Sequence, residues 1–471
     1  MARLDERDYT YFGTVRGMCR RCRKIVPARV FLRPDGVWQQ SLCPDCENAP
    51  ARIAADKDWF LDRVLKPLPD KAPLRFAHPP REGCPRDCGP CTWHASPCQL
   101  PVVSITNACN LRCPLCFTYN RAAPAYHMSL DEMRALVDWV VESSGPVDLI
   151  NITGGEPTLH PDLEGILACC RRPEIGRVTM NSNGLRLAED PALCRRLAEL
   201  GVHVILSLSA LDSATSVELH GRDLVAMKLR AIENLTAAGV PMTLLTVMVR
   251  GVNEAAAGRI LELMRGNDRI LSLTVQTMTY TGQGGGEFPG RAHIPVDEAA
   301  RIVAAQSGGD LRFEDFVTRP PAHPLCYLTC YMLKDERKLV PFTRFAPPAR
   351  IAALMADSYL IRLEGGRTFF TDAINEAYAR GDAAQRALFR TLVERLYPST
   401  GPVPSVFERQ RIAEQAVRTV YVHAHMDEDT FDCSRAMHCP DLVPVAPGRL
   451  VPACTYNLFY RREDPRFYVE R

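Results

Sequence analysis

The chain has 471 residues, which is too many for one ordinary hydrophobic core, so two or three domains are expected. Its formal net charge of +2 argues against a general electrostatic binder of nucleic acid and leaves no polybasic membrane patch. We therefore expect a small-molecule or lipid-like partner. The N-terminus lacks the apolar core of a signal peptide, and no run of about 18 apolar residues occurs, which predicts a cytoplasmic protein without a transmembrane segment.

Cysteine content is the strongest compositional signal. Nineteen cysteines in a chain expected in the cytoplasm indicate metal sites rather than disulfides, because that compartment keeps thiols reduced. Cys169, Cys170 and Cys194 lie in helical patterns and are expected to be inert. The others form tight groups at positions 19/22, 43/46, 84/88/91/98, 109/113/116, 326/330 and 433/439/454.

The first predicted module, residues 1–66, contains two C-x2-C knuckles. They are Cys19 with Cys22, and Cys43 with Cys46. Two such knuckles typically fold around one tetrahedral zinc or iron ion. We predict a metal site without a catalytic role here; the alternative is a zinc ribbon that docks a partner.

Residues 67–100 are predicted to form a proline-rich linker followed by a cluster loop. The spacing C-x3-C-x2-C occurs at Cys84, Cys88 and Cys91, and Cys98 follows. Because four thiolates can close an iron–sulfur cluster, we predict an auxiliary [4Fe-4S] cluster held by these four residues.

Residues 101–310 alternate between buried strands and amphipathic helices. Strands are expected at 101–106, 147–153, 177–181, 203–209, 241–249 and 271–278. Successive β/α units predict an α/β fold with a parallel sheet and right-handed crossovers, curled into a partial (β/α)6 TIM-like barrel. In such a barrel the chemistry lies at the C-terminal ends of the strands.

The second C-x3-C-x2-C triplet follows the first of these strands directly. It comprises Cys109, Cys113 and Cys116 in CNLRCPLCF. Three thiolates leave one iron of a four-iron cluster open, so this loop is predicted to carry the catalytic cluster. The sequence GGEP, residues 154–157, ends the second strand at the same edge of the barrel.

Residues 311–471 are predicted to form a helical and auxiliary-cluster domain. Cys433, Cys439 and Cys454, together with either Cys326 or Cys330, are predicted to hold a further [4Fe-4S] cluster. A nearby histidine could replace one cysteine; the candidates are His323, His423, His425 and His438. Segments 349–363 and 382–398 look like amphipathic helices that pack on the barrel and cap its mouth.

CNLRCPLCF and NITGGEPTLHPDL together resemble the radical S-adenosylmethionine (SAM) superfamily. In that family three cysteines hold a [4Fe-4S] cluster whose fourth iron is chelated by SAM. The resemblance implies that the SAM amino group is lined largely by the backbone of Gly154, Gly155, Glu156 and Pro157. It also implies that Phe117 lies near the adenine, and that Ser207 and Ser209 project toward the ribose or carboxylate.

The remaining motifs resemble a multi-cluster group of that superfamily. They are the N-terminal knuckles, GCPRDCGPC, LHGRDLVAMKLRAIENLTAAG and VPACTYNLFYR. The group includes archaeal tetraether lipid synthase and the methyltransferase that acts on 7,8-dihydro-6-hydroxymethylpterin. The resemblance implies a rubredoxin-like N-terminal module, one or two auxiliary clusters and an external one-electron reductant.

The expected function is therefore that of a radical SAM enzyme. Such an enzyme cleaves SAM to a 5'-deoxyadenosyl radical, takes hydrogen from an unactivated carbon, and forms a C–C bond or transfers an alkyl or methyl group. Alternatives are transfer of the 3-amino-3-carboxypropyl group of SAM and radical peptide maturation. An iron–sulfur electron carrier is the alternative outside enzymes, although a carrier has no need of the SAM pocket that GGEP indicates.

Overall fold

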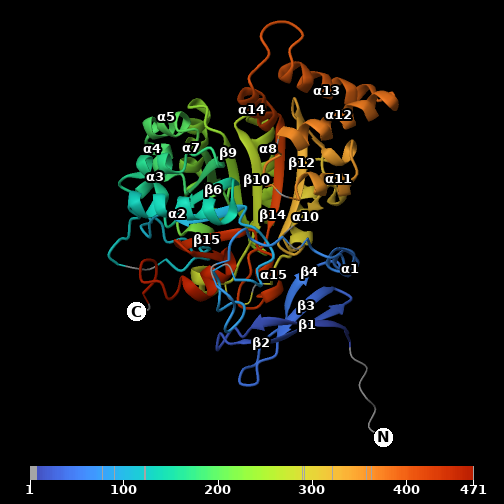
Figure 1. Cartoon of the computed structure of the whole chain (residues 1–471). Helices are drawn as coiled ribbons and strands as arrows, with labels where there is room; N and C mark the ends of the chain where they lie inside the picture. Colours follow the sequence, from blue (N-terminus) through green and yellow to red (C-terminus); the bar gives the residue numbers. More distant parts are fainter. Residues whose placement is uncertain are drawn as a thin grey trace.

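The computed structural model describes residues 8–469 except 70, 77, 90, 121–122, 289, 291, 321, 357 and 362. It opens with an antiparallel sheet whose strands follow the chain order: β1 (Thr10–Met18), β2 (Ile25–Arg33), β3 (Gly36–Ser41) and β4 (Ala51–Ala54). Helix α1 (Lys57–Val64) follows, with Asp56 accepting hydrogen bonds from the backbone of its first turn. Figure 1 shows this module at one end of the molecule.

All six predicted barrel strands are present as parallel neighbours in sequence order. They are β5 (Leu100–Ser104), β6 (Val147–Thr153), β7 (Ile175–Ser182), β8 (His203–Ser207), β9 (Met242–Met248) and β10 (Ile270–Thr277). The predicted α/β barrel is therefore the core of the fold.

Helices cover the outside of this sheet. They are α2 (Leu130–Ser144), α3 (Leu163–Cys169), α4 (Leu185–Glu189), α5 (Pro191–Glu199), α6 (Ser213–His220), α7 (Val225–Ala237), α8 (Ala257–Gly266) and α10 (Val296–Ala305). Helix α9 (Gly282–Glu287) lies instead against the loop that follows β5. Ser129 and Glu132 form the capping box at the start of α2, as the sequence predicts.

The sheet does not stop at the predicted boundary between residues 310 and 311. Strand β14 (Val417–His423) pairs in parallel with β10, and β15 (Asp441–Ala446) pairs in parallel with β5. Strands β11 (Val317–Thr318), β12 (Tyr327–Asp335), β13 (Lys338–Pro341) and β16 (Arg449–Pro452) complete the two edges. Segments that follow the barrel in sequence therefore extend it on both sides, as the strands in Figure 1 show.

Four further helices pack together around buried phenylalanines, among them Phe342, Phe345, Phe369 and Phe389. They are α11 (Pro348–Leu354), α12 (Leu363–Ala379), α13 (Ala383–Leu396) and α14 (Val406–Ala416). The expectation that these helices cap the barrel mouth is corrected. The cavity beneath them is lined by Arg177, Leu271 and Val417, which lie at the starts of barrel strands, so the helices cover the end opposite to GGEP (Figure 1).

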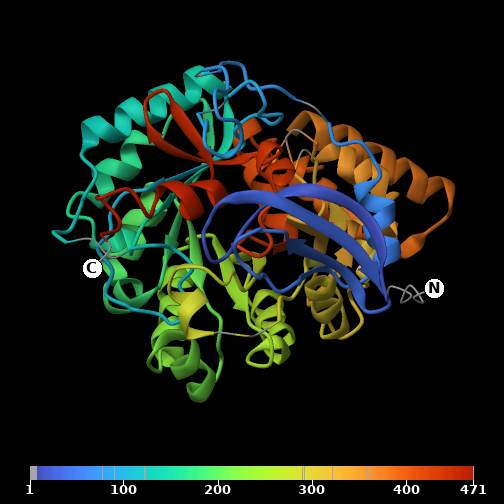
Figure 2. The ribbon, with the colours of Figure 1, turned by 90° about the horizontal axis from the view of Figure 1, so that it is seen from below.

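Side-chain alternation along the strands creates an interior lumen. In β6, Ile150 and Ile152 are fully buried in the hydrophobic core, whereas Leu149, Asn151 and Thr153 line the interior cavity. Seen from below, in Figure 2, the N-terminal sheet and C-terminal segments lie across the barrel ribbon. Among the described residues, no helix is both long and apolar enough to cross a membrane.

Candidate active site

The loop that carries Cys109, Cys113 and Cys116 leaves the end of β5. Cys109 is exposed and the other two thiols are half-buried. The backbone N–H of Leu111 donates to Cys109 Sγ over 3.4 Å, a contact that suits a cluster thiolate. The N–H of Gly284 in α9 donates to the carbonyl of Cys116 over 3.0 Å, so α9 packs directly on this loop.

Two glycines let the end of β6 approach the segment before Cys109. The N–H of Gly155 donates to Thr106 O over 2.8 Å. A Cβ on Gly154, which has a φ of +153°, would lie 2.3 Å from that same oxygen. A Cβ on Gly155 would lie 2.2 Å from Ala108 O. Only glycine permits this close approach, which places GGEP beside the cysteine loop.

Glu156 is buried and fixes the turn rather than projecting into open space. Its carboxylate accepts hydrogen bonds from Thr158 Oγ1 (2.7 Å), Ser182 Oγ (2.9 Å) and the N–H of Asn183 (2.7 Å). Burial raises the pKa of Glu156, although these donors oppose the shift. The carboxylate therefore ties the end of β6 to the end of β7.

The barrel encloses a lumen with a volume of about 270 Å³. Phe117 and Gly154 both line it, so the site formed by the cysteine loop and GGEP opens directly into the barrel interior. Many of the remaining lining residues have polar side chains and come from the strands and the C-terminal segment: Ser104, Asn151, Thr153, Thr179, Asn181, His203, Thr243, Ser272, Thr274, Gln276, Tyr421, His423, Asn457 and Arg461.

Phe117 is held at the border of the lumen by the C-terminal segment. Its ring stacks on His425 at a centroid distance of 4.8 Å and an interplanar angle of 23°. Its carbonyl accepts a hydrogen bond from Asn457 Nδ2 over 2.9 Å. The expectation that Phe117 lies beside the adenine of SAM stays a prediction.

The structure gives the two expected SAM-contacting serines other partners. Ser209 Oγ is buried and accepts a hydrogen bond from the N–H of Val247 over 3.0 Å. Ser207 Oγ accepts from Lys228 Nζ over 2.9 Å. Neither serine lines the lumen. Both hydroxyls link the end of β8 to its neighbours, and the expected contact of these serines with SAM stays a prediction.

Sequence reasoning missed a polar group at the end of β7. Ser182 and Asn183 bind Glu156, and Asn183 Nδ2 donates to Asn110 Oδ1 within the cysteine loop over 2.7 Å. The buried Lys228 donates to the carbonyl of Ser207 over 2.6 Å, and burial lowers its pKa to about 8. The run NSNG directly after the third strand was the available signal, because polar residues at strand ends face the site.

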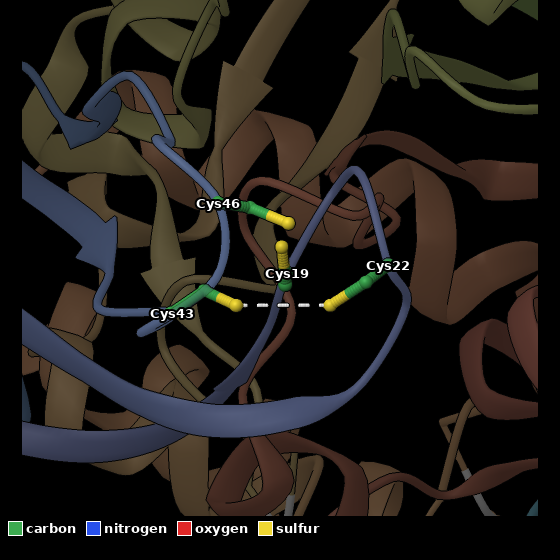
Figure 3. A group of neighbouring side chains, drawn as sticks. All are labelled: Cys19, Cys22, Cys43 and Cys46. Atoms are coloured by element: carbon green, nitrogen blue, oxygen red, sulfur yellow. Dashed lines mark hydrogen bonds between the residues drawn. The ribbon is translucent and has the colours of Figure 1, made fainter.

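The N-terminal knuckles bring four thiols together (Figure 3). The sulfurs of Cys19, Cys22, Cys43 and Cys46 all lie within 4.8 Å of one another, and those of Cys22 and Cys43 are 3.7 Å apart. A single tetrahedral ion with bonds of about 2.3 Å requires sulfur separations of about 3.8 Å, so this site fits one zinc or iron ion. Burial alone would raise the pKa of Cys19. Hydrogen bonds, including one from the backbone of Cys22, outweigh this effect and lower the pKa to about 6.

The first auxiliary group differs from the prediction in its fourth member. Cys84, Cys88 and Cys91 line one small cavity beneath α15 (Cys433–Met437). Cys433 Sγ lies 3.5 Å from Cys84 O, and Cys84 Sγ lies 3.9 Å from Cys433 O. Cys98 instead belongs to the main barrel core, because it directly precedes β5 and that strand fixes its position. The structure therefore groups Cys433, not Cys98, with this triplet.

The C-terminal group brings together three of its predicted cysteines rather than four. Cys326, Cys439 and Cys454 line a single cavity, whereas Cys330 is fully buried in the main core on β12. The expected choice between Cys326 and Cys330 therefore falls on Cys326, and Cys433 lies with the other centre. Four histidines line the same cavity: His323, His423, His425 and His438.

The donor set around these three thiols suits an iron–sulfur cluster. Arg435 Nη2 donates to Cys326 Sγ over 3.3 Å, and the N–H of Met426 donates to Cys454 Sγ over 3.3 Å. Within the part of the chain that the structure describes, only the N-terminal thiols form a cysteine group compact enough for one ion.

Comparisons with known proteins agree with this site. Residues 103–264 match the Radical SAM superfamily. The chain is 25% identical to the 7,8-dihydro-6-hydroxymethylpterin dimethyltransferase of Methanocaldococcus jannaschii, over 95% of this chain and 93% of that protein. It is 30% identical to the GTP 3',8-cyclase of Pectobacterium atrosepticum, over 44% of this chain and 62% of that protein.

Among solved structures, the chain is similar to Streptococcus suis SuiB bound to S-adenosylmethionine. The TM-score is 0.37 at 19% sequence identity, with 44% of this chain and 46% of that chain covered. The cysteine loop, the GGEP strand end, the parallel barrel and the superfamily match together lead to one conclusion: this chain is a radical SAM enzyme.

Proposed function

We propose that this enzyme uses SAM to start radical chemistry on an unactivated carbon of a small molecule held in the barrel lumen, and that the reaction ends in alkyl or methyl transfer or in C–C bond formation. One observation carries the proposal: Gly154 of the GGEP strand end and Phe117 of the cysteine loop both line the lumen. A reactive species formed at this site would meet a substrate inside the barrel rather than in bulk water.

The residues of the site have separate proposed roles. Cys109, Cys113 and Cys116 would hold the catalytic [4Fe-4S] cluster, and the backbone of Gly154 and Gly155 would face the SAM amino group. When bound, the cluster and SAM together supply a 5'-deoxyadenosyl radical, which can remove hydrogen from an unactivated carbon. The barrel walls would exclude water and hold the target carbon close to this radical.

The auxiliary centres have distinct proposed roles. The cavity of Cys326, Cys439 and Cys454 shares Tyr327, His423, His425 and other wall residues with the lumen. A cluster at these three thiols would lie near enough to exchange an electron with the substrate. The centre at Cys84, Cys88, Cys91 and Cys433 shares no lining residue with the lumen, which favours a role in electron supply.

The likeness to a pterin dimethyltransferase over nearly the whole chain supports methyl or alkyl transfer. Polar side chains in the lumen, such as Asn151, Asn181 and Gln276, also support a substrate with hydrogen-bonding groups, because buried polar side chains need partners. We further propose that the enzyme works in the reducing cytoplasm with an external one-electron reductant, where its many thiols stay available for metal.

The test is to identify the nucleoside that the protein releases from SAM. After anaerobic reconstitution with iron and sulfide, SAM and dithionite are added, and the products are identified by mass spectrometry. We expect 5'-deoxyadenosine, and we expect it to be lost in Cys113→Ala. Methylthioadenosine in its place would support 3-amino-3-carboxypropyl transfer instead. A fully loaded protein that cleaves no SAM would contradict the proposal.

A further inference from the structure

Arg461 follows β16 in the chain and lines the lumen from the C-terminal segment. The residue is buried, with an exposed fraction of 4%. Its Nε donates a hydrogen bond to the carbonyl of Tyr119 over 2.7 Å, and its Nη1 donates to Ser104 Oγ over 2.9 Å. Ser104 ends β5 and Tyr119 follows the cysteine loop, so these bonds fix the guanidinium at the SAM end of the barrel.

The guanidinium keeps some hydrogen-bonding capacity after these contacts. Its Nη2 donates to Asn120 Oδ1 over 3.2 Å, so each nitrogen has one acceptor among the described residues. A guanidinium carries five N–H groups, one on Nε and two on each terminal nitrogen. Nη1 and Nη2 of Arg461 therefore each retain one N–H. Two N–H groups on neighbouring nitrogens match two oxygens of a carboxylate or a phosphate.

No carboxylate in the described part of the chain forms an ion pair with Arg461. Its hydrogen-bond acceptors are a carbonyl, a hydroxyl and an amide, all of which are neutral. The charge of Asp464 acts on Arg461, but this carboxylate is paired with Arg466 at 2.7 Å. The ring of Phe467, whose centroid lies 4.3 Å from Cζ, adds cation–π attraction and no negative charge.

The other charged residues that line the lumen have partners of opposite charge. Arg177 forms an ion pair with Glu414 at 2.8 Å. Asp441 accepts hydrogen bonds from two tyrosine hydroxyls, and the positive charge of the buried Arg319 acts on it. Among the described residues, Arg461 is therefore the one lining charge that is left without a partner.

A buried charge without a partner is costly, which points to compensation of Arg461 by a bound ligand. Burial lowers the pKa of Arg461, but a guanidinium stays protonated in proteins. The thiolate of Cys116 is another negative charge that would act on Arg461, but SAM bound at that loop would bring a positive charge beside it. An anion inside the lumen supplies the missing charge directly.

We infer that Arg461 binds an anionic group of the substrate, a carboxylate or a phosphate, at the SAM end of the lumen. This inference rests on the proposed function, which places the substrate in the lumen. Gly154 and Phe117 line the same cavity, so a substrate anchored at Arg461 has the carbons nearest its anionic group at the end where the radical forms. None of the three catalytic cysteines lines this cavity, which favours an anion of the substrate over one of SAM.

Binding can be measured without turnover. Pterins are the probes, because the chain is similar to a pterin dimethyltransferase over nearly its whole length. The reconstituted holoenzyme is given SAM but no reductant, and it is titrated with pterin-6-carboxylate and with the uncharged 6-hydroxymethylpterin, followed by pterin fluorescence. We expect the carboxylate to bind at least about tenfold more tightly. Formate should compete with pterin-6-carboxylate but not with 6-hydroxymethylpterin, relative to chloride at the same ionic strength.

Arg461→Gln has a matched control in the next residue. Arg462→Gln removes the same charge from a position that does not line the lumen. We expect Arg461→Gln to abolish the preference for the carboxylate, whereas Arg462→Gln keeps it. Arg461→Lys keeps the charge but not the planar pair of donors, so it should keep only part of the preference. Formate competition in the native protein tests the site even if Arg461→Gln fails to fold.

SAM binding, measured by equilibrium dialysis in the same proteins, separates the two sources of an anion. Weaker SAM binding in Arg461→Gln with an unchanged pterin preference would assign the anion to SAM and overturn the inference. Equal Kd values for the two pterins, no binding of either, or equal behaviour of Arg461→Gln and Arg462→Gln would overturn it too, even if 5'-deoxyadenosine forms. A carboxylate preference in a protein that cleaves no SAM would uphold the anion site while the proposed function fails.

Discussion

Cys433 and Cys98 give the sharpest test of how the thiols are grouped. The sulfur of Cys433 lies 3.5 Å from the carbonyl of Cys84, whereas Cys98 is buried in the barrel core. We predict that Cys433→Ala damages the first auxiliary centre and that Cys98→Ala does not. Both changes replace a buried thiol by the same side chain, so a general effect on stability is matched.

The expected magnitude follows from the grouping of the cysteines. One mononuclear site and three four-iron clusters amount to about thirteen metal ions per chain. Cys433→Ala removes one of four thiolates, so its centre should lose between about one iron, which leaves a three-iron cluster, and about four irons, which is complete loss. Cys98→Ala should retain the native count.

The assay is iron and acid-labile sulfide per chain after anaerobic reconstitution, with Mössbauer spectra that separate three-iron from four-iron clusters. A native iron count in Cys433→Ala together with iron loss in Cys98→Ala would refute the grouping. It would restore Cys98 as the fourth ligand of Cys84, Cys88 and Cys91.

Three further predictions concern the barrel. Ser209→Ala should keep SAM cleavage within about twofold of the native rate, because its hydroxyl bonds the backbone of Val247; a loss of about tenfold would instead support a direct contact of Ser209 with SAM. Glu156→Ala removes the acceptor of the Asn183 N–H and should lower the free energy of unfolding by at least about 1–3 kcal/mol. We expect a lower Tm for Glu156→Ala than for Glu156→Gln, and equal Tm values would contradict this. Burial lowers the pKa of Lys228 to about 8 in the folded protein. Between about pH 8 and pH 10 the unfolded chain therefore binds more protons than the folded one, so the free energy of unfolding rises with pH. The rise is about 3 kcal/mol at most. Denaturant unfolding of metal-free protein should show this rise, and a rise of the same size in Lys228→Met would exclude Lys228 as its source.

The barrel strands could be predicted because each strand has a recognisable apolar pattern within its own short stretch of sequence. A run such as residues 147–153 is apolar enough to identify a buried strand without knowledge of its neighbours, and β6 has the same bounds. The two cysteine triplets are equally local, since three residues on one short loop must lie close together. The site at the end of β6 follows from the same reasoning, because the order of strands fixes which ends meet.

The fourth cysteine of the first auxiliary centre could not be predicted in this way. Cys433 meets Cys84 only because α15 returns to the cluster loop, and nothing in the spacing of either segment encodes that return. The amphipathic pattern of residues 382–398 likewise predicts a buried face but not which end of the barrel it covers. The roles of Ser207 and Ser209 could not be fixed from sequence either, because a serine at a strand end can bond its neighbours as readily as a ligand.

The grouping of Cys84 with Cys433 also has a consequence for biogenesis. These residues are 349 positions apart, and the strands that flank both edges of the barrel are likewise among the last to be synthesised. A cluster bridging them cannot be completed on the ribosome until nearly the whole chain has emerged. Metal insertion would therefore serve as a late checkpoint on folding, because a truncated or misassembled chain lacks the fourth thiolate that retains the cluster.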